Sequence, residues 1–505
     1  MLRPALFALI ALPLLSPTGA SAQSLGSGLI STDAARHYGL ERMWFTQLAL
    51  DRGRGRAAGL HLHVSRTRAH TVLEIEHDGK RYVFSERERD AFGKEIGVEG
   101  AQAKATEQLA AIEADLKAAG AKDAPLPEVE KHVVPEITLY ASSERGTVHA
   151  IDGETGQTRW IATVGTASYP TTAPAANDEF VAVLNGSTLY MLQAADGSLV
   201  WTRKTIGSPG AGPALTNEMV LIPMLNGHVE SLLLDDPKRP LATYQSFGRI
   251  TVQPIVSYNS VAWPTGAGNL YVGLAREPGM RFRLKARDAI HSAPAFLPPD
   301  KVIVTSLDGY VYCVNEAKGN ILWRFTTGEP ISHSPVALDD RVYAITDRGN
   351  LYALDAETSQ EQWVASGIKS YVAGNARRLY CIDTRGNLAI VDANTGARLG
   401  TLPSGRIDMP LMNVETDRII LVSSTGLVQC FREANLPFPL VHNFDEAAAE
   451  AQPRRTPTPT TPAAGDEPMP PAAVDPFAGG AADPFADPAP AAPAAADPAD
   501  PFATP

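Results

Sequence analysis

The chain has 505 residues, of which 44% are hydrophobic, and a formal net charge of −12. Ten acidic and two basic residues lie from Phe444 onward, so that end carries −8 and all the preceding residues together only −4. Because the residues before Phe444 are together close to neutral and show no basic face, we do not expect nucleic acid as a partner.

Residues 1–22 are predicted to be a secretory signal peptide. A single Arg3 precedes an apolar stretch at 5–15, and Ala20-Ser21-Ala22 forms a small-residue cleavage site. The apolar stretch is too short to cross a membrane, and no other segment of the sequence reaches transmembrane length. We therefore expect an exported protein, periplasmic or extracellular. Because the first cysteine is Cys313, we do not expect a lipoprotein.

Residues 23–136 are predicted to form a small α/β accessory segment. Its helix places Ala105, Leu109 and Ile112 on one apolar stripe. One early strand is expected to complete the first of the repeats that follow, and a partial ninth repeat is the alternative. The expected elements are strands at 43–50 and 60–64, a hairpin at 71–85 around Asp78-Gly79, and a helix at 101–119.

Residues 137–443 contain eight repeats, each marked by a glycine. The glycines recur at steps of 37 to 41 residues after β-branched runs, which predicts a hairpin turn between two strands. A repeat of about 40 residues rich in strands is typical of a β-propeller with one four-stranded blade per repeat. The sequence therefore predicts an all-β fold with an eight-bladed propeller. The glycines are Gly146, Gly186, Gly227, Gly268, Gly309, Gly349, Gly386 and Gly426.

A bulky apolar residue follows most of these glycines at a fixed distance. It lies 14 or 15 residues on, at the start of the strand that follows a second polar turn. A flat ring at this place can wedge between neighbouring blades, so we predict a structural role in blade docking. The seventh repeat has Gly400 at this position and lacks the ring. The predicted docking residues are Trp160, Trp201, Phe282, Trp323 and Trp363, with Leu241 and Leu440 as weaker equivalents.

Prolines mark the start of the expected innermost strands, whose free edge tolerates the missing N–H group. They are Pro174, Pro213, Pro254, Pro294, Pro335 and Pro410. Polar residues near these prolines are candidates for the mouth of the central channel, where they could bind an anionic ligand or a peptide; ordinary solvated loop residues are the alternative. These candidates are Arg249, His291, His333, Arg406 and Asp408.

Residues 444–505 are predicted to be a disordered, acidic tail rich in proline and alanine. The tail has too few apolar residues to bury a core. Asp-Pro-Phe occurs three times in it, and an isolated phenylalanine in a polar coil can dock a partner; low-complexity drift is the alternative. The phenylalanines are Phe477, Phe485 and Phe502.

The repeat itself resembles a known family. AIDGETGQTRW at 150–160 matches the Ala-x-Asp-x-x-Thr-Gly-x-x-x-Trp repeat of pyrroloquinoline-quinone-type propellers, and ALDAETSQEQW at 353–363 is a close variant. This family includes quinoprotein dehydrogenases, which bind the quinone and calcium on the propeller axis. It also includes non-enzymatic members such as the propeller lipoprotein of the outer-membrane β-barrel assembly machine. The resemblance implies a propeller fold over about 137–443 and one of these two activities.

The residues favour the non-enzymatic branch. No two cysteines are adjacent, as they often are above the quinone in the dehydrogenases, and the repeats have no long insertions that could build a pocket. His61 and His63 share one face of a strand, but two histidines are a weak zinc signal. We expect no cofactor, no metal and no catalytic residue. A disulfide between Cys381 and Cys430 is a further possibility.

The sequence as a whole therefore predicts a monomeric scaffold for envelope or secreted proteins, with a possible role in outer-membrane protein assembly. The alternatives are a quinone-dependent oxidoreductase and a sensor of small ligands or glycans.

Overall fold

The computed structural model describes residues 28–50, 55–90, 92–118, 126–238, 241–405 and 407–442. The chain divides into two units, and all of these residues belong to the first, Met1–Pro453. The predicted signal peptide, Arg406 and the three tail phenylalanines lie outside the described residues.

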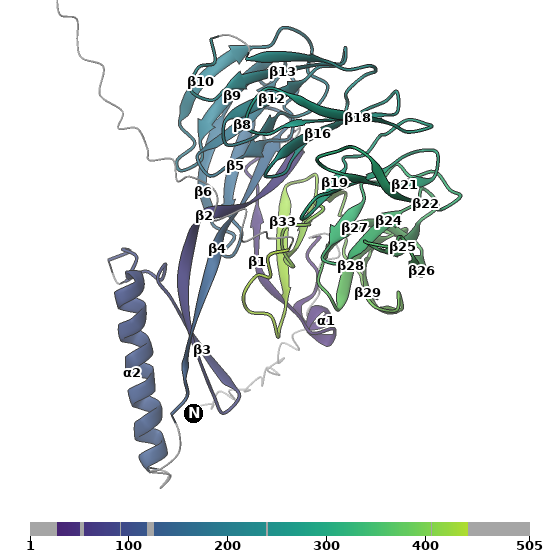
Figure 1. The fold of residues 1–505 in the computed structure, drawn as a ribbon. Helices are drawn as coiled ribbons and strands as arrows, with labels where there is room; N and C mark the ends of the chain where they lie inside the picture. Colours follow the sequence, from purple (N-terminus) through teal and green to yellow (C-terminus); the bar gives the residue numbers. More distant parts are fainter. Residues whose placement is uncertain are drawn as a thin grey trace, which may run out of the picture. The chain divides into compact units, whose positions relative to one another are not determined.

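In these residues the strands form eight antiparallel sheets, seven of four strands and one of five (Figure 1). The second to seventh sheets are simple meanders of consecutive strands. Their strands are β7 Ala175–Ala176, β8 Phe180–Asn185, β9 Thr188–Gln193, β10 Leu199–Lys204; β11 Ala214–Leu215, β12 Met219–Pro223, β13 His228–Leu233, β14 Ala242–Gln245; β15 Ile255–Val256, β16 Ser260–Thr265, β17 Asn269–Leu274, β18 Met280–Lys285; β19 Ala295–Leu297, β20 Lys301–Thr305, β21 Tyr310–Asn315, β22 Ile321–Thr326; β23 Val336–Leu338, β24 Arg341–Ile345, β25 Asn350–Asp355, β26 Glu361–Ser366; and β27 Ile368–Gly374, β28 Arg378–Asp383, β29 Leu388–Asp392, β30 Arg398–Leu402.

The first and last sheets of the ring both take strands from the start of the chain. β1 (Leu40–Gln47) pairs with β33 (Leu427–Glu433) and is the outer strand of the last sheet. β2 (Ala57–His77) pairs with β4 (Val129–Ser143) and is the inner strand of the first sheet. Both early strands thus complete sheets of the repeats, and the described residues form no separate ninth sheet. The remaining strands are β5 Thr147–Asp152 and β6 Thr158–Thr163 in the first sheet, and β31 Met409–Pro410 and β32 Ile419–Val422 in the last.

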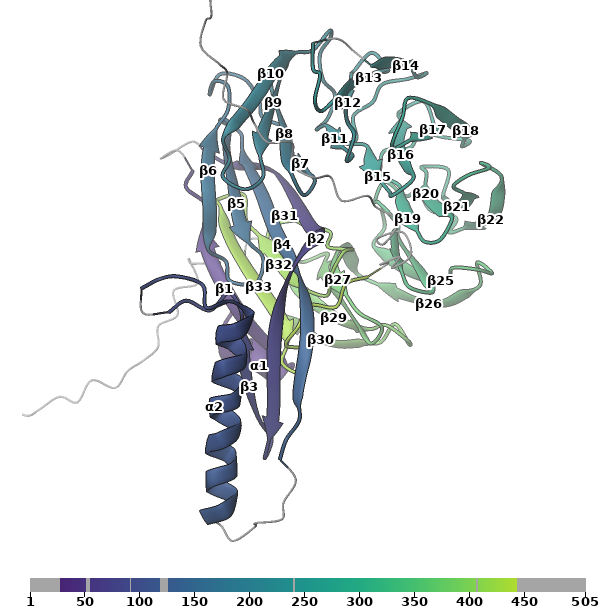
Figure 2. The same ribbon diagram turned by 60° about the vertical axis from the view of Figure 1, so that its left-hand side comes forward.

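The core is divided into layers between the sheets. Eight buried apolar clusters each join two successive sheets, and one of them joins the last sheet to the first. In that closing cluster Trp44 and Cys430 of the last sheet pack with Leu139 and Ile151 of the first. The described sheets therefore form a closed ring, which confirms the predicted all-β propeller (Figure 2).

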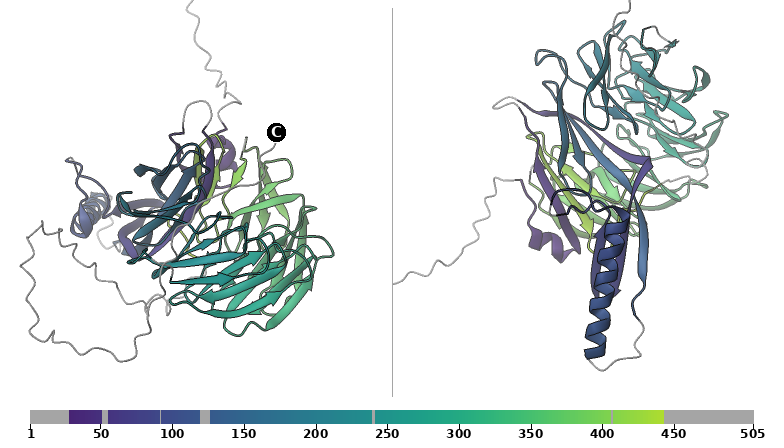
Figure 3. Two further views of the ribbon diagram at one scale, coloured as in Figure 1. Left: turned by 90° about the horizontal axis from the view of Figure 1, so that it is seen from above. Right: turned by 90° about the vertical axis from the view of Figure 1, so that its left-hand side faces the viewer.

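The first sheet extends beyond the ring into an arm. The second half of β2 pairs with β3 (Lys80–Ser85) through a turn at Asp78 and Gly79, both at positive φ, and also with the first half of β4. Helix α2 (Gly97–Ala118) lies along this extension and buries Ala105 and Ile112 against it (Figure 3, right). We call residues 69–118 and 126–135 the arm. The other helix, α1 (Thr32–His37), precedes β1.

The rings of the repeats wedge between neighbouring sheets. The indole N–H of Trp160 donates to the carbonyl of Ala194 in the next sheet at 2.8 Å. The same bond to the next sheet is made by Trp201, Trp323 and Trp363 at 3.1, 2.9 and 2.9 Å. Phe282 has no N–H group and only packs, with its ring over Gly319.

The prediction that two leucines replace the ring as weaker docking residues is wrong. Leu241 and Leu440 are 37% and 43% exposed and do not wedge. In the last sheet the ring comes instead from Trp44 on β1, whose indole donates to Gly153 of the first sheet at 2.9 Å. At Gly400 an added Cβ would lie 2.1 Å from the ring of Tyr38, so the N-terminal segment also fills that place.

The three cysteines are buried and unpaired, so the possible Cys381–Cys430 disulfide is absent. Burial raises the pKa of the Cys313 and Cys381 thiols to about 12. Both thiols are therefore packing groups and are poorly suited to act as nucleophiles.

Candidate functional site

One face of the ring is built from the eight glycine turns and from the loops that link each sheet to the next. We call it the loop face. Seven of the eight turn glycines have φ between +78° and +93°, and Gly186 has +58°. Each turn joins the second and third strands of its sheet, so all the turns lie at the same end of the sheets.

Four large apolar side chains are exposed on the loop face over successive sheets. Tyr169, Ile206 and Phe247 lie in the linking loops and are 60%, 60% and 70% exposed, and Leu225 lies in a glycine turn and is 40% exposed. We call these four residues the loop patch. Ile206 and Phe247 each lie two residues after the outer strand of their sheet, β10 and β14.

Hydrogen bonds from two backbone amides and one side-chain amide join pairs of neighbouring segments on this part of the face. The amide of Gly186 donates to the carbonyl of Pro170, next to Tyr169, at 2.8 Å. The amide of Leu225 donates to Ser208, in the loop of Ile206, at 2.9 Å. Farther along, the Asn269 side-chain amide donates to the carbonyl of Phe247 at 3.2 Å. The sheets from β7 to β18 that carry this stretch follow one another in Figure 2.

The loop patch lies in a part of the loop face that has no carboxylate. Residues 164–174, 185–188, 204–213, 224–228, 246–254 and 265–269 contain neither Asp nor Glu. They contain the exposed cations Lys204 and Arg249 and the partly buried His228. This stretch is therefore apolar with a positive rim, which suits an apolar segment that carries carboxylates.

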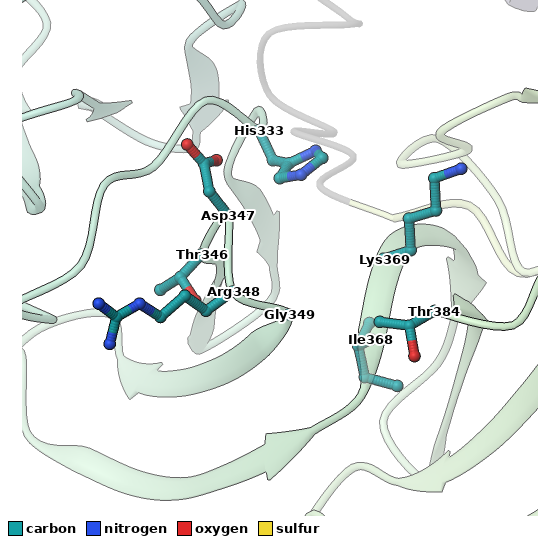
Figure 4. Close-up of a pocket in the computed structure, with 8 residues that line it drawn as sticks. All are labelled: His333, Thr346, Asp347, Arg348, Gly349, Ile368, Lys369 and Thr384. Atoms are coloured by element: carbon teal, nitrogen blue, oxygen red, sulfur yellow. The ribbon is translucent and has the colours of Figure 1, made fainter.

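A shallow depression of about 210 Å³ lies on the same face between two later sheets (Figure 4). It is lined by His333, by the turn that holds Asp347 and Arg348, and by Lys369 on β27. Asp347 accepts hydrogen bonds from the Ser332 amide and hydroxyl at 2.9 and 2.6 Å. Asp347, Arg348 and Lys369 are all exposed, and Arg348 Nη1 lies 3.7 Å from Glu329 Oε1, so the depression presents charges of both signs to solvent.

The predicted channel-mouth residues do not form one site. Arg249 and His291 are exposed in two different linking loops, and His333 lines the depression. Asp408 accepts hydrogen bonds from the Ser424 amide and hydroxyl at 2.6 and 2.5 Å. Burial alone would raise the pKa of Asp408, but these bonds lower it overall. Asp408 thus fastens a turn of the last sheet, and only Arg249 borders the loop patch.

The innermost segments of the first four sheets are in close contact with one another. A Cβ added at Gly59 would lie 2.2 Å from the backbone of Ala173. The Gln253 side-chain amide donates to the carbonyls of Pro174 and Pro213 at 3.1 and 2.7 Å, which ties three sheets together at their inner edges.

One histidine of the pair predicted from the sequence, His63, belongs to a polar contact between the first two sheets. His63 Nε2 lies 2.8 Å from Asp178 Oδ1 of the second sheet, and hydrogen bonds from His63 and Thr67 hold the pKa of Asp178 well below its usual range, although burial opposes this. Burial lowers the pKa of His61 to about 3, so that ring is neutral. The described residues hold no group of three His, Cys, Asp or Glu side chains placed to bind a metal.

Sequence reasoning missed the loop patch because it searched for polar groups near the inner prolines. Two features of the sequence could have indicated the patch. Ile206 and Phe247 are large apolar residues at the same place in two successive linking loops, and the segments of this stretch contain no Asp or Glu. Among the described residues, neither helix is long and apolar enough to cross a membrane.

The chain is similar to a curated protein, the outer membrane protein assembly factor BamB of Yersinia pestis. The two are 21% identical over 247 residues, which is 45% of this chain and 53% of the relative, so the match spans about half the length of that protein. The crystal structure of BamB from Moraxella catarrhalis superposes with a TM-score of 0.50 at 16% identity and covers 58% of this chain and 91% of that one. A computationally designed protein, Ika8, superposes with a TM-score of 0.49 at 16% identity, covering 58% and 92%.

The family model described as outer membrane protein assembly factor BamB matches residues 121–221 and 260–433, more than half of the chain. These ranges contain the repeats that carry Trp160, Trp323 and Trp363, and they leave out most of the arm. The repeats, the ring of sheets and the family match agree, and the chain belongs to the BamB family of pyrroloquinoline-quinone-type repeat propellers.

Proposed function

We propose that this protein is a non-enzymatic propeller scaffold of the cell envelope, exported to the periplasm or beyond the cell. It would dock a partner that takes part in outer-membrane protein assembly. The observation that carries the proposal is the loop patch, four exposed apolar side chains on a stretch without carboxylates. Membership of the BamB family supports the process, and the eight described sheets support an eight-bladed frame.

The chemistry of the patch indicates what the partner presents there. Burying exposed apolar side chains stabilises a complex by about 25 cal/mol per Å² of apolar surface before the entropy cost of association. Lys204 and Arg249 at the rim favour carboxylates and disfavour cations. We therefore expect a partner segment that combines large apolar side chains with Asp or Glu. Four side chains make a small interface, which favours reversible binding.

The test is capture of the partner by the full chain after chemical cross-linking in envelope extracts. The wild-type protein is expected to recover β-barrel assembly components. The double variant Ile206→Asp with Phe247→Asp places two carboxylates in the patch, and recovery should fall by about tenfold or more because the same patch would then repel an acidic segment.

Leu199→Asp is the matched control, since Leu199 is 58% exposed but lies on the outer strand β10, away from the loop face. It should recover the components as the wild type does. Equal recovery by the patch variant would contradict the docking site, and failure of the wild type to recover any assembly component would contradict the proposed process.

A further inference from the structure

Two of the four loop-patch residues are aromatic, and buried side chains hold their main chains in place. Phe247 is 70% exposed and Tyr169 is 60% exposed. Each lies in a loop that links one sheet to the next, and every residue of both loops is described. An exposed ring on a fixed main chain needs little further ordering when it enters an interface, because folding has already restricted it.

The main chain of Phe247 is fixed on both sides by β17 of the next sheet. Its amide donates to the Tyr271 hydroxyl at 2.8 Å, and its carbonyl accepts from the Asn269 side-chain amide at 3.2 Å. Asn269, the first residue of β17, is 2% exposed, and Tyr271 is 8% exposed. Both anchoring groups are therefore buried, whereas the ring whose main chain they hold lies on the surface.

A second layer of contacts fixes these anchoring groups in turn. The indole of Trp263 donates to the Ser246 hydroxyl at 2.8 Å, and the Ser246 amide donates to the Gly227 carbonyl at 2.8 Å. The ring of Trp263 also stacks on that of Tyr271, with the two centroids 6.0 Å apart and the planes 8° from parallel. Because Trp263 is fully buried, Tyr271 cannot move its hydroxyl away from Phe247 without disturbing the core.

Tyr169, in the loop before the second sheet, is held in a similar way. The Asn185 side-chain amide donates to the Tyr169 carbonyl at 3.0 Å and to the Thr171 hydroxyl at 3.1 Å, and Asn185 is buried. The Tyr169 side chain lies against Gly186, where an added Cβ would be 3.0 Å from its Cβ and its Cγ. A buried asparagine thus fastens the main chain of each exposed aromatic residue.

The equivalent position in the sixth sheet shows what is particular to Phe247. Asn350, like Asn269, follows the turn glycine directly and is the first residue of its strand. Its side-chain amide also donates to the preceding linking loop, to the Glu329 carboxylate at 3.0 Å. That loop, residues 327–335, contains no Phe, Tyr or Trp. Both sheets therefore have the bond from the asparagine, but only the bond from Asn269 holds an exposed aromatic residue.

We propose that Phe247 and Tyr169 are the anchors of the loop patch and that Asn269, Tyr271 and Asn185 are positioning residues, which hold the two rings in place for the partner. This inference rests on the proposed function. It assigns most of the binding energy to the two aromatic residues, since interface hot spots are enriched in aromatic side chains. The aliphatic residues of the patch then serve mainly to exclude water around them.

The first test needs no partner and measures hydrogen exchange of the purified full chain by mass spectrometry. Tyr271→Phe removes only the hydroxyl that accepts from the Phe247 amide, so exchange in residues 246–250 should become faster by about tenfold or more. Asn350→Ala is the matched control and should leave exchange in these residues as in the wild type. If Tyr271→Phe leaves it unchanged as well, the main chain of Phe247 is not held by Tyr271 and the inference is wrong.

The second test uses the full chain in living cells, with the photo-cross-linker p-benzoylphenylalanine in place of Leu225 as the reporter of an occupied patch. Asn269→Ala and Tyr271→Phe should each lower the yield of the protein adduct by about threefold or more, because a loosened ring must be ordered again on binding. Phe247→Ala should lower it by about tenfold or more. Asn350→Ala should give the yield of the wild type. Tyr271→Phe keeps its ring, so it decides the test if Asn269→Ala does not fold.

A double variant separates positioning from a general effect on the fold. Tyr271→Phe combined with Phe247→Ala should give the same adduct yield as Phe247→Ala alone, because Tyr271 acts through that ring. A further loss in the double variant would show that Tyr271 supports only the fold. An adduct that forms equally well in Tyr271→Phe and the wild type would refute the positioning role and leave docking at the patch intact. No adduct in the wild type would instead contradict the docking itself.

Discussion

At the scale of the residue, the glycine that ends the second polar turn of a repeat has two separate requirements. It takes a positive φ, +71° at Gly156 and at Gly396 and +74° at Gly197. It also lies beneath the ring of the preceding sheet, since a Cβ at Gly197 would come within 2.5 Å of Trp160. The turn glycine and the wedge ring are therefore one packing unit shared by two sheets, although they lie in different repeats.

Ser359 stands in one of these turns at the position where the others have glycine, and this difference leads to a prediction. It occupies the glycine place of the turn at 355–359 with a φ of +62°, a backbone conformation that costs a side chain about 1 kcal/mol or more. Ser359→Gly should therefore raise the free energy of unfolding by about 0.5–1 kcal/mol, after the greater chain entropy of glycine is subtracted. Urea unfolding followed by tryptophan fluorescence measures the change.

The matched control is the reverse change at an equivalent turn. Gly396→Ser should lower the free energy of unfolding by more than Ser359→Gly raises it, because the new Cβ would lie 2.5 Å from the Trp363 ring in addition to the backbone strain. If Gly396→Ser is neutral, the packing unit described above is not a constraint.

At the scale of the element, β1 does more than add a strand. Its neighbour Tyr38 covers Gly400 of the seventh sheet, and Trp44 supplies the ring that the eighth repeat lacks. Ile30, just before α1, is buried between the same two sheets. Residues 28–47 thus fill the wedge position in the seventh and eighth repeats, neither of which has a wedge residue of its own there.

Trp44 is expected to be one of the most sensitive positions in the chain. Its side chain is 7% exposed, and its indole donates the hydrogen bond that joins the last sheet to the first. Trp44→Ala should therefore lower the free energy of unfolding by about 3–5 kcal/mol. Phe45→Ala on the same strand is the control, because Phe45 is 54% exposed and should cost no more than about 1 kcal/mol. Guanidinium unfolding of both variants checks this, and similar losses would argue against a sealing role for Trp44.

Much of the fold could be predicted from local sequence, and the remainder depends on distant residues. The turn glycines and the Trp160-type rings are signals within one repeat, the hairpin at Asp78-Gly79 is a local signal of the accessory segment, and all three lie in or between observed strands. The prediction that Leu440 is a wedge residue was wrong because the aromatic side chain at that place in the last sheet comes from Trp44, almost four hundred positions earlier. The loop patch was missed because exposure of an apolar side chain depends on which loops become neighbours, and no single repeat contains that information.

At the scale of the whole molecule, a buried ionic group lies at the joint between the last and first sheets. The guanidinium of Arg418 is fully buried and binds both carboxylate oxygens of Glu154 in the first sheet, at 3.1 and 3.2 Å. It also donates to the carbonyl of Pro437 at 2.9 Å. Asp417 beside it accepts from the Leu440 amide at 3.0 Å, but its Oδ2 is buried without a partner.

This group predicts a pH dependence of stability. Burial raises the pKa of Asp417 to about 6, above its value of 3.8 in the unfolded chain, although Arg418 opposes the shift. The folded state therefore binds a proton on the Asp417 carboxyl more tightly than the unfolded chain does. The resulting contribution to the free energy of unfolding is present in full below pH 3.8 and is lost as the pH rises through 6.

The comparison is between wild type and Asp417→Asn, so that the other titrating groups cancel. The free energy of unfolding of the wild type, minus that of the variant, should rise by up to about 3 kcal/mol between pH 7 and pH 4. Urea unfolding at fixed ionic strength across this range measures it. A difference that stays constant with pH would show that Asp417 does not titrate between these limits.

The pairing of β1 with β33 also constrains how the molecule can form. Leu40 pairs with Glu433, so the two strands are separated by nearly the whole length of the repeats. Native contacts between residues so distant in sequence form slowly, because the intervening chain must first be ordered. As the chain emerges from its N-terminus, β1 has no partner until β33 has followed. Any intermediate with all the central sheets in place still exposes an unpaired edge and the Trp44 ring, and this is the stage at which a chaperone or an aggregating neighbour would find a binding surface.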